Sequence, residues 1–352
     1  MQPRNNYRHI SFFLTVVSII SLFCNISCKT SPKKENSIPE PQWITDKKGA
    51  FPDSEYISQL GTGTTAKEAE NNSIAQLASY FNTNVKSFIE GETFTYNNTN
   101  DEGIVARTIK SSVVTSTDLE LFALETEEPY YLVREKKWYC CAHINRKTAW
   151  NQYEPIVRDQ KNAFYSVYNL AQAQEEPLEK IKMYKKAQYE GEMLSAFMYK
   201  AYMFSKPLTD SAFAKDKAVA ASIPGLIQNE KNKCVFAVDV SNDFGQTVSS
   251  SITKAFSQMG FPVVTKNENS IYTVQALVNY NEIDEDDLMV YYPSIKVVVK
   301  TKDKSLYVYE GKTERILSYN ESKAKKSACT ELAGLIEREL ESDFKSTIGL
   351  SE

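Results

Sequence analysis

The residues best suited to acid–base or nucleophilic chemistry lie together in residues 138–144, WYCCAHI. His143 stands two positions after Cys141, so in a β-strand the imidazole and the thiol would lie on the same face. Enzymes that use a nucleophile and a base normally draw the two groups from separate elements of the fold. We therefore interpret His143 as a structural histidine of a β-sheet, and a catalytic Cys141–His143 pair is the less favoured alternative.

Metal binding and hydrolase chemistry need sets of partners that this sequence does not offer. The only other histidine, His9, lies in the amino-terminal segment, so no zinc site or Ser-His-Asp triad can be assembled around His143. We expect free, buried thiols without metal-ligand spacing at Cys140, Cys141, Cys234 and Cys329. A disulfide to Cys234 or Cys329 stays open, and it would require contact between distant parts of the chain.

Two further motifs are better explained by structure than by chemistry. The acidic run at residues 282–287 (EIDEDD) lacks the spacing and the glycine of an EF-hand loop, so we expect a solvated hairpin tip. The glycines Gly61 and Gly63 are too close together for a phosphate-binding loop. We therefore predict no catalytic, cofactor-binding or metal-binding residues, and a protein that is not an enzyme.

The amino terminus has the composition of a secretory signal. Arg4, Arg8 and His9 give a polar, positive start, and an apolar run follows over residues 10–23, ISFFLTVVSIISLF. This run is too short for an ordinary membrane-spanning helix and has the length of the apolar region of a signal peptide. The chain is therefore expected to leave the cytoplasm.

A cysteine closes this signal. Cys28 follows Ser27, the kind of small residue that a lipoprotein signal peptidase prefers, so we predict a signal peptide at residues 1–27 and lipidation of Cys28. Asn25 stands where leucine is usual, and an ordinary signal peptide or an uncleaved anchor is the alternative. Lys29, in place of the aspartate that retains some bacterial lipoproteins at the inner membrane, favours the outer membrane.

Length and charge bound the remaining possibilities. A chain of 352 residues is expected to form more than one domain. Residues 1–27 contain Arg4 and Arg8 and no acid, so their removal changes the net charge from −4 to −6. A chain of this charge lacks the basic surface that nucleic-acid binding requires, and we expect no nucleic-acid partner. Residues 28–41, rich in Pro, Ser, Lys and Glu, predict a linker.

A strand, a turn and a capped helix are predicted over residues 51–81. Alternation around Tyr56 indicates a half-buried strand, and Gly61 and Gly63 predict a sharp turn after it. Thr65 and Glu68 have the spacing of a capping box at the start of an amphipathic helix. We expect this helix to end near residues 82–84 and further β-structure to follow at 85–96, 104–123, 130–135 and 138–144.

Together with the residues just before them, these features resemble the Lpp-twenty family of bacterial lipoproteins. That family shows a Pro-x-Trp opening, an aromatic-Pro turn, a strand, a Gly-x-Gly turn and an alanine-rich helix that begins with Glu-Ala. The matching residues are Pro41, Trp43, Phe51, Pro52, Tyr56, Ile57, Gly61, Gly63, Glu68 and Ala69. Residues 138–149 (WYCCAHINRKTA) resemble the family's closing strand, with Asn145 and Arg146 after it. The resemblance covers about residues 42–150 and implies a cell-envelope lipoprotein without known catalytic residues.

The rest of the chain divides into a helical segment and a second α+β unit. Apolar periodicity predicts helices at 163–173, 178–189 and 194–204, and one pair of them resembles a single tetratricopeptide repeat, which is too little for an array. We therefore expect a helical spacer. Later alternation predicts a β-α-β-β-β-β-α order with an antiparallel sheet and helices on one of its faces.

The sequence thus predicts an α+β protein with a lipoprotein signal. The expected divisions are a signal peptide at 1–27, a linker at 28–41, an Lpp-twenty-like α+β domain at 42–150, a helical segment at 151–230 and a carboxy-terminal α+β domain at 231–350.

The expected function is that of a non-enzymatic envelope lipoprotein, attached to the outer membrane through Cys28 on its periplasmic or surface face and bound to other envelope proteins. Some members of the Lpp-twenty family are linked to flagellar outer-membrane structures. A periplasmic carrier of a lipid or glycan, or an enzyme with an unrecognised site, is the alternative.

Overall fold

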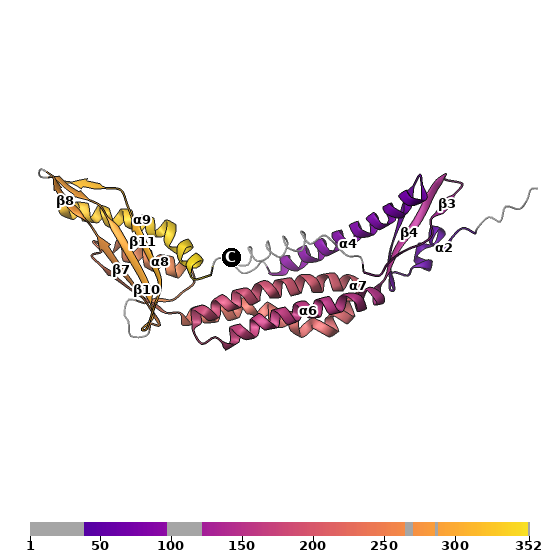
Figure 1. Ribbon diagram of the computed structural model, residues 1–352, viewed down its shortest axis with the longest axis horizontal. Coiled ribbons are helices and arrows are strands. Elements are labelled where there is room, and N and C mark those ends of the chain that lie inside the picture. Colours follow the sequence, from indigo (N-terminus) through magenta and orange to yellow (C-terminus); the bar gives the residue numbers. More distant parts are fainter. Residues whose placement is uncertain (1–38, 97–121, 265–269, 286–287, 351–352) are drawn as a thin grey trace, which may run out of the picture.

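The computed structural model describes residues 39–96, 122–264, 270–285 and 288–350. The molecule is elongated and bowed, with β-sheet at each end and long helices between the two ends (Figure 1). The α+β class is therefore confirmed. The predicted signal peptide, Cys28 and residues 29–38 of the linker lie outside the described residues. One hydrophobic core continues from Ile57 to Leu350, and the predicted domain boundaries stay predictions.

The amino-terminal sheet is built around one central strand. Its antiparallel strands are β1 (Tyr56–Gly63), β2 (Leu124–Thr126), β3 (Tyr130–Leu132) and β4 (Lys137–Asn145). All of the other three pair with β4, which confirms the predicted first strand and the hairpin of residues 130–144. Trp43 and Phe51, from the region of the short helices α2 (Gln42–Thr45) and α3 (Lys47–Ala50), pack with Cys141 of β4.

The prediction of a sharp turn at Gly61 and Gly63 was wrong. Both residues belong to strand β1, and neither has a positive φ. A Cβ atom at Gly61 would lie 2.1 Å from the backbone nitrogen of Ser73 in helix α4 (Ala66–Tyr96), and one at Gly63 would lie 2.6 Å from that of Ala69. The glycines are therefore needed because the helix backbone lies directly against the strand.

Helix α4 also continues past the predicted stop at residues 82–84, and its last part replaces the strand expected at 85–96. Val85 is buried against Ala196 and Tyr199 of helix α7 (Pro177–Lys233), so packing outweighs the weak helix propensity of the polar residues before it. Most of the β-structure expected at 104–123 lies outside the described residues.

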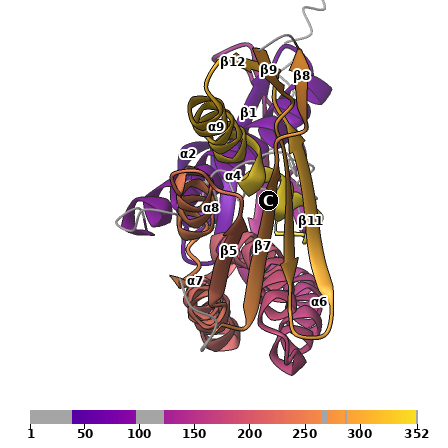
Figure 2. The ribbon, with the colours of Figure 1, turned by 90° about the vertical axis from the view of Figure 1, so that its left-hand side faces the viewer.

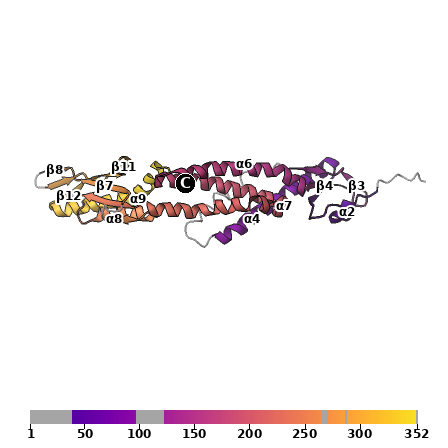
Figure 3. The same ribbon diagram turned by 90° about the horizontal axis from the view of Figure 1, so that it is seen from below.

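The middle of the molecule is a helical bundle made of α6 and the two parts of α7 (Figure 3). Helix α6 (Arg146–Ala173) begins well before the predicted residue 163, because Asn145 caps it by accepting a hydrogen bond from the Thr148 amide at 2.9 Å. The two helices expected at 178–189 and 194–204 are one continuous stretch of α7. Non-helical angles at Ser205 then turn α7 back on itself.

The break in α7 has an identifiable cause. Pro207 has no amide hydrogen to bond the carbonyl of Met203, four residues earlier. The guanidinium group of Arg146 donates to that carbonyl instead, and it also lies 3.5 Å from the carbonyl oxygen of Phe204. The Arg146 side chain therefore supplies hydrogen bonds to carbonyl groups at the end of the first part of α7.

The carboxy-terminal unit contains two sheets. The five-stranded sheet has the order β11-β10-β7-β5-β6, with β5 (Phe236–Ser241), β6 (Val263–Val264), β7 (Tyr272–Asn279), β10 (Ser294–Lys300) and β11 (Ser305–Lys312). The three-stranded sheet has the order β12-β9-β8, with β8 (Glu282–Glu285), β9 (Leu288–Tyr291) and β12 (Ile316–Ser318). Helices α8 (Thr247–Gln258) and α9 (Glu321–Thr347) cover one face of the larger sheet (Figure 2).

The predicted order of strands and helices in this unit is confirmed, with β8, β9 and β12 as additions. The larger sheet is mixed, because β5 runs parallel to both of its neighbours while β7, β10 and β11 are antiparallel. A helix between β5 and β6 reverses the chain direction twice, which produces a parallel pair. At the junction with the bundle, the phenol of Tyr272 donates to the carboxylate of Glu176 and accepts from the amide of Leu178 at 3.4 Å.

Candidate functional site

His143 lies on the central strand β4 and is buried. Its Nε2 atom is 3.2 Å from Oε1 of Glu127, which lies between β2 and β3. The imidazole ring stacks on Phe51 with 4.3 Å between ring centroids, and its Nδ1 atom is buried without a hydrogen-bond partner. The ring is therefore clamped between an aromatic side chain and one carboxylate, which suits a structural role.

Cys141 lies on the same face of β4, as the sequence predicted, and packs with Trp43 and Phe51. Burial raises the pKa of its thiol to about 12. Since the thiolate is the reactive form of cysteine, this thiol is protonated near neutral pH and is a poor nucleophile. The structure therefore does not favour the catalytic Cys141–His143 pair.

All four cysteines in the described residues are free and buried, so the disulfide alternative finds no support. Cys140 points to the opposite face of β4 from Cys141, and burial raises its pKa. Burial also raises the pKa of Cys234 to about 12. The Cys329 sulfur lies 3.2 Å from the Phe244 amide and 3.3 Å from the Tyr280 hydroxyl, which fixes it in the core.

The acidic run at 282–287 begins in strand β8, and β8 and β9 form the predicted hairpin. Its tip at 286–287 lies outside the described residues. Within the ranges that the structure describes, no three His, Cys, Asp or Glu side chains are placed to hold a metal ion. A surface hollow of about 340 Å³ on α9 is lined by five exposed polar residues: Lys323, Lys326, Ser327, Thr330 and Glu331. Such a hollow differs from the enclosed, mainly apolar sites that take lipids.

The exposed apolar side chains have a clearer pattern. Strand β7 pairs with β10, and β8 pairs with β9. The same register holds in both pairs, from Thr273 opposite Lys300 to Glu285 opposite Leu288. Alternate residues of these strands therefore share one face across both sheets. Tyr280 and Tyr291 belong to the face covered by helices, where their rings meet at 6.2 Å.

The opposite face of these sheets carries no helix among the described residues, and we call it the outer face. It holds five of the thirteen large hydrophobic side chains that are exposed in the described residues. The five are Leu277, Ile283, Tyr292, Val308 and Leu317. Tyr319, which follows directly after β12, is the most exposed of all thirteen, at 82%. Concentration of exposed apolar side chains on one face is typical of surfaces that bind other proteins.

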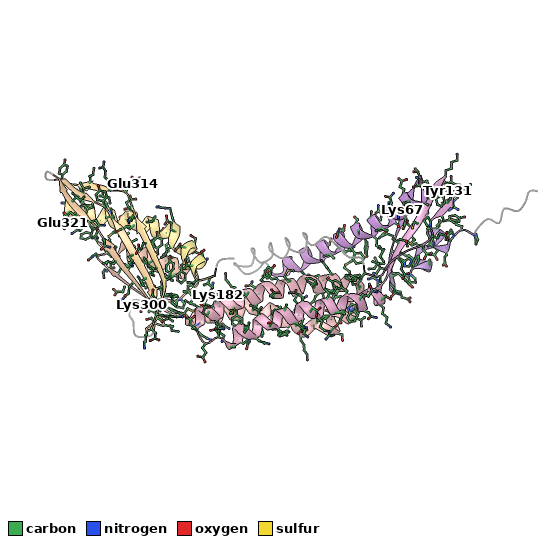
Figure 4. The ribbon with its side chains drawn as sticks, in the orientation of Figure 1. Lys67, Tyr131, Lys182, Lys300, Glu314 and Glu321 are labelled. Carbon is green, nitrogen blue, oxygen red and sulfur yellow. The ribbon has the colours of Figure 1, made fainter. Side chains whose placement is uncertain are left out.

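Charged residues accompany the outer face. Lys296 of β10 and Glu310 of β11 lie opposite each other and form an ion pair of 2.7 Å across this face. Figure 4 places Lys300 near the helical bundle, whereas Glu314 and Glu321 lie at the far tip of the unit. The outer face therefore combines exposed apolar side chains with one ion pair, Lys296–Glu310.

Sequence reasoning missed the outer face. One sequence signal is Leu277, an apolar residue on the side of β7 where Thr273, Gln275 and Asn279 are polar. Alternation in β7 indicates the buried side, where Tyr272, Val274, Ala276 and Val278 lie, but it does not indicate which residues of other strands join Leu277 on the opposite side. No helix in the described ranges combines the length and the apolar character that crossing a membrane requires.

Comparison with known proteins gives only distant similarities. No protein-family model matches the chain, and no curated protein sequence does. The structure of a secreted protein from Helicobacter pylori is similar over 80% of this chain and 96% of its own, with 12% identity and a TM-score of 0.32. A candidate lipoprotein from Caulobacter crescentus is similar over 34% of this chain and 96% of its own, with 11% identity and a TM-score of 0.24. Similarity at this level establishes neither a shared family nor a shared activity.

Proposed function

We propose that this protein is a non-enzymatic lipoprotein of the bacterial cell envelope, anchored through Cys28, that binds other envelope proteins with the outer face of its carboxy-terminal unit. The resemblance of residues 42–150 to the Lpp-twenty family and the signal before Cys28 support the anchor and an outer-membrane location. The observation that supports the binding role is the gathering of five exposed apolar side chains on the outer face.

The arrangement of the chain suits such a role. Helix α2 and the amino-terminal sheet lie at one end of the molecule, and the carboxy-terminal sheets that carry the outer face lie at the other (Figure 1). Helix α6 has 28 residues, a length of about 42 Å. The bundle would therefore hold the outer face well away from an anchor at Cys28, where it could reach partners such as flagellar or other outer-membrane structures.

Site-specific photo-crosslinking in native envelopes tests this proposal. Val308 on the outer face and Leu170 on α6 are matched, with 49% and 52% exposure, so a crosslinker at each position samples a different surface of equal accessibility. We expect distinct crosslinked envelope proteins from position 308 and none in common with position 170.

A variant pair gives the functional counterpart. The double substitution Leu277→Glu and Val308→Glu should reduce those crosslinks at least about tenfold, since a buried unpaired carboxylate opposes binding. It should also fail to complement a deletion strain, whereas Leu170→Glu complements. Full complementation by the double variant, at normal abundance, would contradict the proposal, as would crosslinks that are the same at both positions.

A further inference from the structure

The hairpin of β3 and β4 at the amino-terminal end carries exposed apolar and basic side chains. Tyr131 of β3 is opposite Trp138 of β4, and their ring centroids lie 5.4 Å apart. Tyr131 is 41% exposed, and Val133 at the hairpin tip is 75% exposed. Trp138 is partly buried near the start of β4, and Leu132 is the buried residue of β3.

Basic residues surround this tip. Arg134, Lys136 and Lys137 are all exposed, and Glu135 is the only acid among residues 133–137. Tyrosine and tryptophan favour the interface between water and hydrocarbon, where the ring is shielded and the polar atom stays hydrated. Lysine and arginine beside them are attracted to anionic headgroups. The combination at this hairpin fits a lipid surface better than it fits water or the apolar surface of another protein.

The path of the chain brings the same hairpin towards the anchor. The two terminal nitrogens of the Arg134 guanidinium group donate to the carboxylate of Glu40, at 2.5 and 2.8 Å. Even a fully extended segment from Cys28 to Glu40 is only about 40 Å long. The Arg134–Glu40 ion pair therefore lies within that distance of a lipid on Cys28. Tyr131 and Lys67 lie at this end of the molecule, away from the carboxy-terminal unit (Figure 4).

We propose that the tip of the β3–β4 hairpin, with Tyr131, Val133 and Trp138 flanked by Lys136 and Lys137, inserts into the headgroup region of an anionic phospholipid membrane. This inference rests on the proposed anchoring at Cys28. A second contact beside the lipid would fix the orientation of the amino-terminal sheet, and with it the direction in which the bundle projects the outer face.

Tryptophan quenching by brominated phospholipids tests the insertion. The lipidated protein is reconstituted into vesicles that contain phosphatidylglycerol brominated on its acyl chains. Trp43 is buried and the indole of Trp150 donates to Thr209, so Trp138 is the tryptophan that lipid would reach. We expect clear quenching in the wild type, its loss in Trp138→Phe, and at least a twofold decrease in the variant Lys136→Glu, Lys137→Glu.

Two further samples separate this inference from the anchor. Residues 28–352 coupled through Cys28 to a maleimide phospholipid are held at the membrane whether or not cells acylate Cys28, since the other described thiols are buried. Tyr319→Trp in the Trp138→Phe background places an indole at the far end of the molecule as a second reporter. Quenching of Trp138 in the coupled protein, without quenching of the far-end indole, supports the insertion even if natural acylation fails. Vesicle-bound protein whose Trp138 is not quenched, or a Tyr319→Trp sample whose far-end indole is quenched instead, would overturn it.

Discussion

The close contact between strand β1 and helix α4 can be tested by adding one methyl group. In Gly61→Ala, the new Cβ atom would lie 2.1 Å from the Ser73 nitrogen and 2.3 Å from the Ala69 carbonyl oxygen. Both are backbone atoms of one helix, so no side-chain rotation can relieve the overlap. We expect the free energy of unfolding to fall by about 3 kcal/mol, the upper part of the range for overpacked interiors.

The matched control is Gly225→Ala. Gly225 lies in helix α7, and a Cβ atom there would have no neighbour within 4 Å. Because alanine is the better helix former, this variant should gain about 0.5–1 kcal/mol. Urea unfolding followed by circular dichroism and tryptophan fluorescence measures both changes. A Gly61→Ala protein as stable as the wild type, beside a stabilised Gly225→Ala protein, would show that the helix does not lie against the strand as described.

Three other predictions concern the amino-terminal unit and the buried thiols. Thr65→Ala should lower the unfolding free energy by about 0.5–2 kcal/mol, because the Glu68 amide loses its 3.2 Å bond to the Thr65 hydroxyl; an unchanged urea midpoint would contradict the cap. His143→Gln should retain cellular function in a complementation assay, since a structural histidine tolerates the loss of acid–base capacity; a stable, correctly localised variant that fails would favour an enzyme. Burial raises the pKa of Cys141 and Cys234 from the ordinary 9.0 to about 12, so these thiols ionise at lower pH in the unfolded chain than in the folded protein. Their contribution to the free energy of unfolding is therefore complete below pH 9 and should decline as the pH rises towards 12. A double Cys141→Ala, Cys234→Ala variant should show a smaller alkaline decline in its unfolding midpoint, and an equal decline would assign the effect to other groups.

Local signals predicted the elements that depend on short-range chemistry. Thr65 caps helix α4 as expected, although the Glu68 carboxylate binds the amide and hydroxyl of Thr64, one residue before the position a capping box requires. The alternation of buried residues in β7, β10 and β11 was also sufficient to predict those strands. In both cases the information lies within a few residues of the chain.

Features set by distant contacts could not be predicted in this way. Gly61 and Gly63 indicated a turn because glycine is common in turns, whereas their role depends on a helix backbone that packs against them. Helix α4 continues past residue 84 because Val85 meets α7, more than 100 residues later. The outer face was missed because its residues come from different strands, whose register is known only when the sheets are assembled.

Radiolabelled palmitate incorporation, combined with detergent-phase partition of membrane extracts, tests the central claim of a lipid-anchored envelope protein most directly. A lipidated terminus carries acyl chains whose CH₂ groups each add about 0.8 kcal/mol of membrane affinity. We expect the wild-type protein and Cys24→Ser to carry label and enter the detergent phase, and Cys28→Ser to lose the label and enter the aqueous phase. A Cys28→Ser protein that keeps its label and its detergent-phase partition would contradict the account.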